Sequence, residues 1–295
     1  MSANVHRLGL CVARERGRAS PWLRAVLHEP PRPLQRLGGR AESHGVFSVA
    51  GSRRIIALEA PGGLNLPISI IVPRRIITDA FQSRRVFIGD GQLLTHRGAL
   101  QVEVSRDERL RLNITAARAG VAARSMMSEL AGIAPPDEAQ RVHDAVAAFR
   151  ASLCGDNASN RLETTAGDLI GLGLGSTPSG DDVIAGTAAA LASIAGSTSA
   201  LSNACRRLLN TLKKVIRRSH SRTTALSIEL MSCAVHGYAI PHFSRYATSA
   251  VCGGDIAGAT SQLCKTGHTS GYYLASGAAL ALKALSEHKD GTLHG

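Results

Sequence analysis

The residue composition and pattern of the chain change once, near Asn113, and this change constrains the fold more than any other feature. From His44 to about Ile114, short apolar runs rich in β-branched residues alternate with turn signals such as Gly62-Gly63 and Gly89-Asp90-Gly91. Beyond Asn113 the chain is rich in alanine and leucine. Short strands at this spacing predict a small barrel or sandwich, whereas the alanine- and leucine-rich segments predict packed helices. We therefore predict an α+β protein, with a strand-rich N-terminal domain followed by an α-helical C-terminal domain.

The expected domain boundaries follow this change of composition. Residues 1–43 carry many arginines, several prolines and the only tryptophan, and are expected to form a basic, partly ordered arm. Residues 44–118 are expected to form the β-rich domain, and residues 119–295 the helical domain. The expected strands are VFSVA, RRIIALEA, PISIIVP, RRVFIGDG, GQLLTHRG, ALQVEVS and RLRLNI. The expected helices span residues 121–133, 137–153, 198–218, 224–235, 243–252, 256–265 and 270–288.

Charge and cysteine content limit the partners and the compartment. The net charge is +12, and 19 of the 34 basic residues, all of them arginine, lie in the first 118 positions. Aromatic residues make up only 3% of the chain, so stacking surfaces for bases are scarce, and we rank nucleic acid behind an acidic small molecule or protein. The six cysteines form no C-x-x-C pair, which favours reduced thiols in the cytoplasm. No apolar run reaches the roughly 18 residues of a membrane span, and we expect no secretory signal.

The run GLGLGSTPSGDDVIAG, from Gly171 to Gly186, is the segment that we expect to bind a ligand. Its alternate glycines and its hydroxyl residues lead into a helix start, where backbone N–H groups can hold an anion. The run lacks the lysine of a phosphate-binding G-x-x-x-x-G-K-[ST] loop, and no strong strand precedes it as a dinucleotide fingerprint requires. The candidate anion-binding residues in this loop are Gly173, Gly175, Ser176, Thr177, Ser179 and Gly180.

The two carboxylates that end this loop have competing interpretations. Ser179 and Asp182 fit a capping box, with Ser179 at the N-cap and Asp182 satisfying helix N–H groups. That structural role leaves Asp181 unexplained, so Asp181 is the candidate catalytic residue, which would orient a substrate or hold a metal. Asp181 and Asp182 together are the candidate ligands of a divalent metal, with Mg²⁺ as the candidate cofactor.

The helical half repeats the pattern of this loop once. Ser270 to Ala275, SGYYLA, resembles Ser179 to Ile184, SGDDVI, and each copy follows a short Gly/Thr segment and precedes an Ala/Leu-rich run. Two helix N-termini built alike could face one ligand. At the second N-terminus, Thr269 and Ser270 would bind the anion. Chance similarity between alanine-rich helices competes with that interpretation.

Two further residues are candidates for the same site. His268 precedes the second copy, where an imidazole could donate or accept a proton, although an ordinary loop histidine fits the same sequence. Arg222 and Thr223 lie at another helix start and offer a guanidinium and a hydroxyl to a carboxylate or phosphate. A plain N-cap at Thr223 or Thr224 is an equally good interpretation of that segment.

Three segments together resemble one known family. LIGLGLGSTPSGDDVIAG (Leu169 to Gly186), RTTALS (Arg222 to Ser227) and GHTSGYYLASG (Gly267 to Gly277) are similar to the signature regions of the AllH-type family, which is linked to bacterial oxamate carbamoyltransferase. The resemblance extends from about His44 to about Leu285. It implies a subunit that works with larger acyl-CoA-synthetase-like subunits and transfers a carbamoyl group between oxamate, or a ureido compound, and phosphate, often in purine-nitrogen metabolism.

This chain departs from the family pattern at two places. Ser176 stands where the family usually has leucine, and Tyr272-Tyr273 replaces a Trp-Asp pair. If that acid binds metal or substrate in the relatives, the loss predicts altered or absent chemistry here.

The leading hypothesis is a carbamoyltransferase subunit whose loops at Gly171 to Asp182 and at Gly267 to Ser270 jointly bind an anion such as carbamoyl phosphate or oxamate. Two alternatives stay open. One is a non-catalytic assembly or regulatory subunit, and the other is a metal-dependent phosphate-ester hydrolase that uses Asp181 and Asp182.

Overall fold

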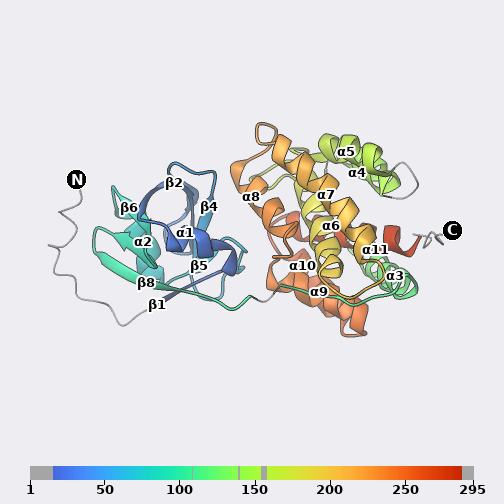
Figure 1. The fold of residues 1–295 in the computed structure, drawn as a ribbon, viewed down its shortest axis with the longest axis horizontal. Helices are drawn as coiled ribbons and strands as arrows, with labels where there is room; N and C mark the ends of the chain where they lie inside the picture. The colour runs from blue at the N-terminus through green and yellow to red at the C-terminus, as the bar shows by residue number, and fades with distance from the viewer. Residues whose placement is uncertain (1–15, 108, 139, 154–157, 288–295) are drawn as a thin grey trace. The chain divides into compact units, whose positions relative to one another are not determined.

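The computed structural model describes residues 16–107, 109–138, 140–153 and 158–287, and the chain divides into two compact units, residues 1–107 and 108–295 (Figure 1). The first unit is an eight-stranded closed barrel and the second is helical, so the predicted α+β class is confirmed. Within the described residues, no helix combines the length and the apolar character that crossing a membrane requires.

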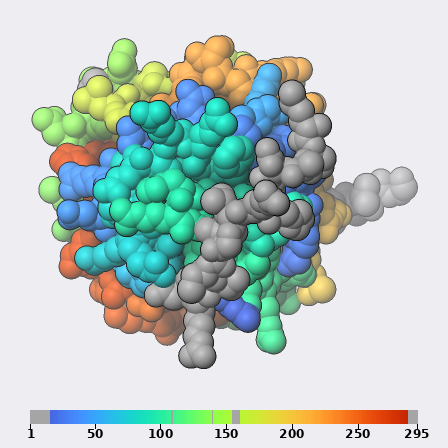
Figure 2. Space-filling view, turned by 90° about the vertical axis from the view of Figure 1, so that its left-hand side faces the viewer, coloured from blue at the N-terminus to red at the C-terminus, as the bar shows by residue number. Residues whose placement is uncertain are grey.

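The barrel unit closes by pairing between strands from its two ends. The strands follow one another around the barrel in the order β1-β5-β4-β3-β2-β6-β7-β8, and β1 pairs in parallel with β8 to close the ring. Closure of this kind leaves no free sheet edge. Figure 2 shows early (blue) and late (green) segments of this unit intermixed on one surface. The strands are β1 (Arg16–Ala19), β2 (Arg32–Arg40), β3 (His44–Val49), β4 (Ile55–Glu59), β5 (Ser69–Ile71), β6 (Val86–Gly89), β7 (Gln92–Thr95) and β8 (Gly98–Val104).

The first strands of the barrel correct our expectation for the N-terminal segment. We expected residues 1–43 to form a partly ordered arm, but residues 16–43 contribute β1, the short helix α1 (Arg24–His28) and β2 to the barrel. The sequence signal for β2 was weak because every residue of β2 is exposed or half-buried, so its sequence lacks the alternation of a strand with one buried face. Residues 1–15 lie outside the described part of the chain.

Two further expectations for the β-rich half are also wrong. Residues 74–82 form a helix, α2 (Arg74–Gln82), that we did not predict. The run RLRLNI, residues 109–114, has no regular secondary structure and is not a strand of the barrel; its Leu112 N–H donates to the carbonyl of Ser193 in the helical unit at 2.9 Å. The alternation of apolar residues in this run therefore reflects one buried face and not pairing with a neighbouring strand.

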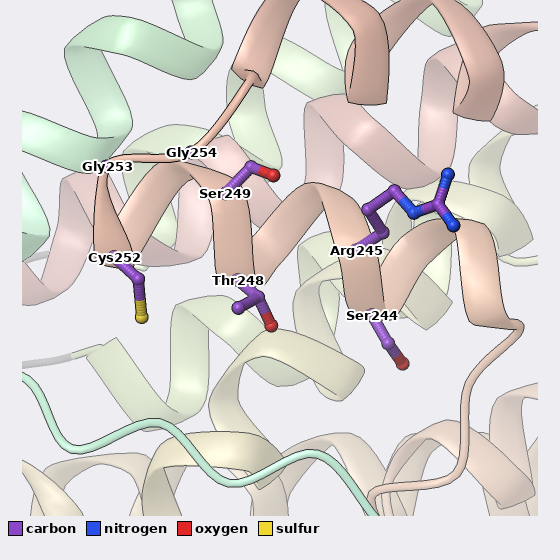
Figure 3. Close-up of a pocket in the computed structure, with 7 residues that line it drawn as sticks. All are labelled: Ser244, Arg245, Thr248, Ser249, Cys252, Gly253 and Gly254. Atoms are coloured by element: carbon purple, nitrogen blue, oxygen red, sulfur yellow. The ribbon is translucent and has the colours of Figure 1, made fainter.

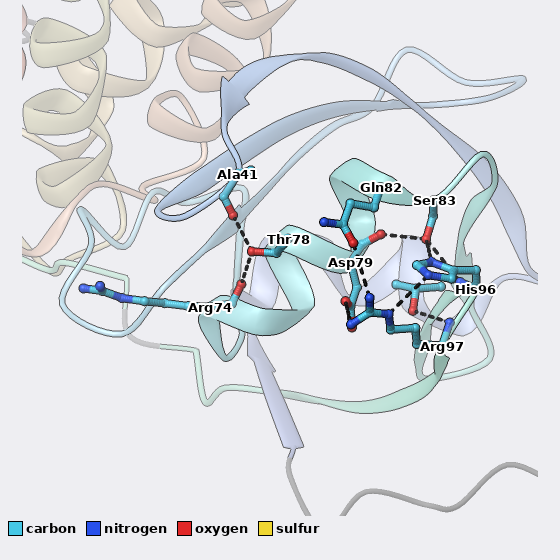
Figure 4. A network of polar contacts seen from close by, with 9 residues as sticks. Ala41, Arg74, Thr78, Asp79, Gln82, Ser83, His96 and Arg97 are labelled. Atoms are coloured by element: carbon cyan, nitrogen blue, oxygen red, sulfur yellow. Dashed lines mark hydrogen bonds and ion pairs between the residues drawn. The ribbon is translucent and has the colours of Figure 1, made fainter.

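Helix α2 is fixed to the turn between β7 and β8 by polar contacts (Figure 4). The buried Asp79 pairs with Arg97, with 3.1 Å between Oδ1 and Nη1. The Ser83 hydroxyl donates to the carbonyl of Asp79 at 2.7 Å and lies within hydrogen-bonding distance of His96 Nδ1. This network holds α2 against the barrel through side-chain contacts, since a helix cannot take part in strand pairing.

The helical unit is built around one buried helix, α6 (Ser179–Ala195). All of its residues except Ala192 and Ala195 are buried, and it packs against α11, α7 and α8. Its alanines and glycines permit that close approach on every side. The remaining helices are α3 (Ala116–Ala131), α4 (Gln140–Ser152), α5 (Ala158–Leu169), α7 (Ser202–Arg218), α8 (Ala225–Ala234), α9 (Pro241–Cys252), α10 (Ile256–Cys264) and α11 (Ser270–Ser286). Helix α5 was not predicted.

Candidate functional site

The two helices that carry the repeated sequence, α6 and α11, lie side by side and run in the same direction. A Cβ built on Gly186 would lie 2.1 Å from the carbonyl oxygen of Leu274, and a Cβ built on Gly277 would lie 2.1 Å from that of Val183. Adding 91 to Val183 and to Gly186 gives Leu274 and Gly277, so the two contacts are reciprocal. The two helices that carry the repeated sequence are therefore related by a local, approximate two-fold axis.

This arrangement brings the two helix N-termini together. The hydroxyl oxygens of Thr177, in the glycine loop, and Ser270, at the start of α11, lie 3.0 Å apart. Each helix N-terminus carries a partial positive charge and several N–H groups without an intrahelical acceptor. Two such ends side by side form a favourable environment for an anion.

The glycines of the loop are required by its backbone. Gly171, Gly173 and Gly175 have φ of +81°, +108° and +94°, a region that other residues rarely adopt. A Cβ on Gly171 would lie 2.1 Å from the carbonyl oxygen of Arg222, and one on Gly173 would lie 2.6 Å from the backbone nitrogen of Ser179. The first two glycines therefore allow the loop to pack against its neighbours, whereas Gly175 meets only the φ requirement.

Asp181 is held by three donors from two segments, the glycine loop and the start of α8. It is buried, and its Oδ1 accepts the Gly171 N–H at 2.8 Å. Its Oδ2 accepts the hydroxyl of Ser227 at 2.6 Å and the hydroxyl of Thr223. The side chain thus fastens the start of the glycine loop and the start of α8 to α6.

Asp182 is also buried, but the Ser270 hydroxyl is the one side-chain donor found for it among the described residues, and the expected capping box is wrong. Pro178, not Ser179, is the N-cap of α6, and the Asp182 N–H donates to the carbonyl of Pro178. The Oδ2 of Asp182 has no hydrogen-bond partner among the described residues. Burial raises the pKa of Asp182 to about 8, the charge of Asp181 adds to the rise, and the nearby Ser270 hydroxyl opposes it.

Tyr273 is the counterpart of Asp182 in the second helix and shares its lack of a partner. Its hydroxyl is the other buried side-chain atom, within the described part of the chain, for which no hydrogen bond is found. Burial raises the pKa of Tyr273 to about 12, and the charge of Glu138 contributes to the rise. Glu138 also accepts a hydrogen bond from the Ser179 hydroxyl. We did not predict Glu138 as a site residue: we expected it inside a helix over residues 137–153, but α4 begins at Gln140 and Glu138 lies in the irregular segment before it.

The other predicted residues lie around this pair of helices. His268 is exposed in the turn before α11, and Thr269 is half-buried at the N-cap without a side-chain capping bond. The Arg222 side chain is exposed, while its carbonyl packs against the glycine loop. Thr224 is the N-cap of α8, as one interpretation predicted, and its hydroxyl also donates to the carbonyl of Ser176 at 2.6 Å. Among the described residues, no group of three or more His, Cys, Asp or Glu side chains is placed to hold a metal.

Two cavities of the helical unit lie away from this site. One, of about 400 Å³, follows α9 and its C-terminal turn, between Ser244 and Gly254 (Figure 3). The other, of about 240 Å³, lies beside α7 and the C-terminal end of α6. Neither is lined by residues of the glycine loop or by the first turn of α11.

Comparison with known proteins matches one segment of the chain. Residues 169–282 match the model of a family described as oxamate carbamoyltransferase subunit AllH. The resemblance carried by the three motifs is thereby confirmed for this segment, which contains the glycine loop, α6 and most of α11 but not the barrel unit. No curated protein and no solved structure matched the chain.

Proposed function

We propose, from the match of residues 169–282 to the AllH family, that this chain is a carbamoyltransferase subunit that binds a small anionic substrate at the paired N-termini of α6 and α11. Carbamoyl phosphate and oxamate are the candidate ligands. The proposal includes larger acyl-CoA-synthetase-like partner subunits and action in the cytoplasm.

The observation that carries the proposal is the pair of unpartnered polar atoms, Asp182 Oδ2 and the Tyr273 hydroxyl. A buried polar group without a hydrogen bond costs about 1–3 kcal/mol, so native proteins rarely keep one. This chain keeps two at equivalent positions, each close to a helix N-terminus. A ligand with acceptor oxygens would satisfy both.

The protonation state of the site favours acceptor ligands. With a pKa of about 8, Asp182 is largely protonated at neutral pH and presents a hydroxyl donor rather than a charge. The Tyr273 hydroxyl and the hydroxyls of Thr177 and Ser270 are further donors. A cluster of neutral donors beside two positive helix ends suits carboxylate or phosphate oxygens better than it suits a metal ion.

Asp181 has a positioning role in this proposal. Its oxygens already accept hydrogen bonds from Gly171, Thr223 and Ser227, so donors occupy the positions that a metal would need. By fixing the glycine loop to α8, Asp181 holds the loop N–H groups and Thr177 in place. His268, exposed beside α11, is the candidate to exchange a proton with the solvent-facing part of the ligand.

The test is calorimetric titration of the full chain with fresh carbamoyl phosphate and with oxamate, each with and without Mg²⁺. Tyr273→Phe removes one hydroxyl and should weaken binding about 10-fold, whereas Tyr272→Phe, the adjacent matched control, should not. Asp182→Ala should weaken binding at least as much, while Asp182→Asn, which keeps a neutral donor, should bind within a few-fold of the unmodified chain.

Three results would contradict the proposal. Equal affinity of Tyr273→Phe, Asp182→Ala and the unmodified chain would show that the ligand binds at another site. Absence of binding together with stable co-purification with a larger subunit would favour the assembly role, and Mg²⁺-stimulated release of phosphate from phosphate esters would favour the hydrolase.

A further inference from the structure

The basic residues of α7 divide between two faces of the helix. Arg206, Leu209, Asn210 and Lys213 follow the spacing i, i+3, i+4 and i+7, and all four line the cavity of about 240 Å³. The other basic residues of the same helix do not line it, and all of them are exposed: Arg207, Lys214, Arg217 and Arg218. One face of α7 therefore supplies one side of the cavity.

Two more basic side chains reach the same cavity from other segments. Arg109 comes from the extended segment that precedes α3, and its guanidinium lies 5.4 Å from the centre of the Tyr238 ring. His236 follows α8, and its Nδ1 is 2.8 Å from the carbonyl oxygen of Ser232, which fixes the ring. The lining thus contains two arginines, one lysine and one histidine, and no aspartate or glutamate.

The Arg206 guanidinium is held in position with donors to spare. Its Nη1 donates to Asn203 Oδ1 at 2.7 Å, and its Nη2 donates to the carbonyl of Ala195 at 3.2 Å. A guanidinium has five N–H donors in a rigid fork. Arg206 therefore keeps donors for a ligand, and fixing its side chain beforehand lowers the entropy lost on binding.

The cavity is separate from the site at the helix N-termini. It is bordered by Ala192, Ala195 and Gly196, at the C-terminal end of α6, whereas Asp182 lies in the first turn. At 1.5 Å of rise per residue, these two ends of α6 are about 20 Å apart. One small ligand cannot occupy both.

We propose that this cavity is a second binding site of the helical unit, which takes a phosphate-type oxyanion through Arg206, Lys213 and Arg109. Arg206, Lys213 and Arg109 bring positive charge to one cavity, and such a site attracts a multivalent anion. Guanidinium groups bind phosphate oxygens in a bidentate manner. The volume is below the roughly 300–1,000 Å³ of sites for drug-sized ligands, so it fits inorganic phosphate, diphosphate or the phosphate end of a larger metabolite.

The test measures binding of phosphate, diphosphate and ATP to the full chain by calorimetry at constant ionic strength, with chloride as the background anion. Lys213→Ala and Arg206→Gln should each weaken binding about 10-fold or more. Lys214→Ala and Arg207→Gln remove the same charges from the face of α7 that does not line the cavity, and should change the affinity less than about two-fold. Tyr273→Phe should leave this binding unchanged, which separates it from the proposed substrate site.

The outcomes divide clearly. Comparable affinities for diphosphate and ATP would assign recognition to the phosphates alone, and a much higher affinity for ATP would assign a nucleotide as the ligand; both support the site. Equal losses of affinity in the lining and control variants would show that the binding depends only on the net charge of the chain, and would overturn the proposal. So would the absence of binding of all three anions by the unmodified chain. Thermal unfolding of each variant confirms that it is folded.

Discussion

The reciprocal contact between α6 and α11 predicts a large cost for one added methyl group. In Gly186→Ala the new Cβ would lie 2.1 Å from the carbonyl oxygen of Leu274, and in Gly277→Ala it would lie 2.1 Å from that of Val183. Real Cβ atoms essentially never approach closer than 3.0 Å, and both neighbours are backbone atoms that cannot rotate away. The two helices must therefore separate locally by about 1 Å, in a core packed as densely as a crystal.

The magnitude follows from three terms. Overpacking of this kind costs about 1–3 kcal/mol. Separation also weakens the hydrogen bond from the Thr187 hydroxyl to the carbonyl of Gly277, now 3.0 Å long, which is worth about 1 kcal/mol. Alanine recovers about 0.5–1 kcal/mol relative to glycine inside a helix. We expect each variant to lose about 2 kcal/mol of unfolding free energy, or about 4–8 °C in Tm for a unit of this size.

Thermal and urea unfolding of the full chain, followed by far-UV circular dichroism, measures the loss. The matched control is Gly167→Ala in α5, where the nearest atom to the new Cβ is Arg222 Nη1 at an ordinary 3.5 Å. That variant should be as stable as the unmodified chain or slightly more stable. Because separation of the helices relieves both clashes, the double variant should lose less than the sum of its parts. If Gly186→Ala and Gly277→Ala behave like the control, the close parallel pairing of the helices is wrong.

Three further predictions concern buried carboxylates. The pKa of Asp182 rises from 3.8 to about 8 on folding, so stability should fall as the pH rises between these values, because only the unfolded state ionises there. In Asp182→Asn this fall, at most about 4 kcal/mol between about pH 5 and about pH 8, should disappear from urea unfolding curves. Asp181→Ala leaves the Gly171 N–H and two hydroxyls without their acceptor and should cost about 3 kcal/mol in the same assay, with Ser227→Ala costing about 1 kcal/mol. In the barrel unit, Arg97→Ala removes the ion-pair partner of the buried Asp79 and should cost about 1–2 kcal/mol, measured by urea unfolding with Arg84→Ala as the surface control.

The sequence predicted those parts of the fold that depend on local pattern. Most strands of the barrel and most helices follow from apolar spacing and turn residues. Barrel closure does not, because β1 pairs with β8 across the length of the unit and β2 has no buried residue. Residues 109–114 show the opposite error, since alternation reports a buried face and not the presence of a neighbouring strand.

The sequence marked the segment in which the candidate site lies, but not the contacts that its residues make. The glycine loop is a local feature, and its three positive φ angles account for the glycine spacing that marked it. Asp181 and Asp182 are neighbours on one helix, so their side chains point about 100° apart, and only the packing of α8 and α11 decides which of them meets donors. Glu138 reaches the site from an irregular segment, and nothing in its local sequence indicates that contact.

The approximate two-fold relation makes one more prediction because it is broken at Tyr273. If the halves were equivalent, an acid at 273 would lie near Ser179 as Asp182 lies near Ser270; instead the Ser179 hydroxyl donates to Glu138. One half of the proposed site then offers a protonated acid, and the other offers carboxylate acceptors. Such a site should orient a ligand with unlike ends, with the carboxylate of oxamate towards Asp182 and its amide towards Glu138.

Oxalate, which has a carboxylate at both ends, should therefore bind less tightly than oxamate, since like charges facing Glu138 repel. Glu138→Gln replaces an acceptor pair by an amide that can also donate, and it should reduce or reverse the preference for oxamate over oxalate. Glu129→Gln, in α3, is the control and should leave the preference unchanged. Calorimetric titration with the two ligands measures the ratio of affinities directly. An unchanged ratio in Glu138→Gln would mean that Glu138 only anchors Ser179, and that the orientation of the ligand is set by Asp182 and the helix N-termini alone.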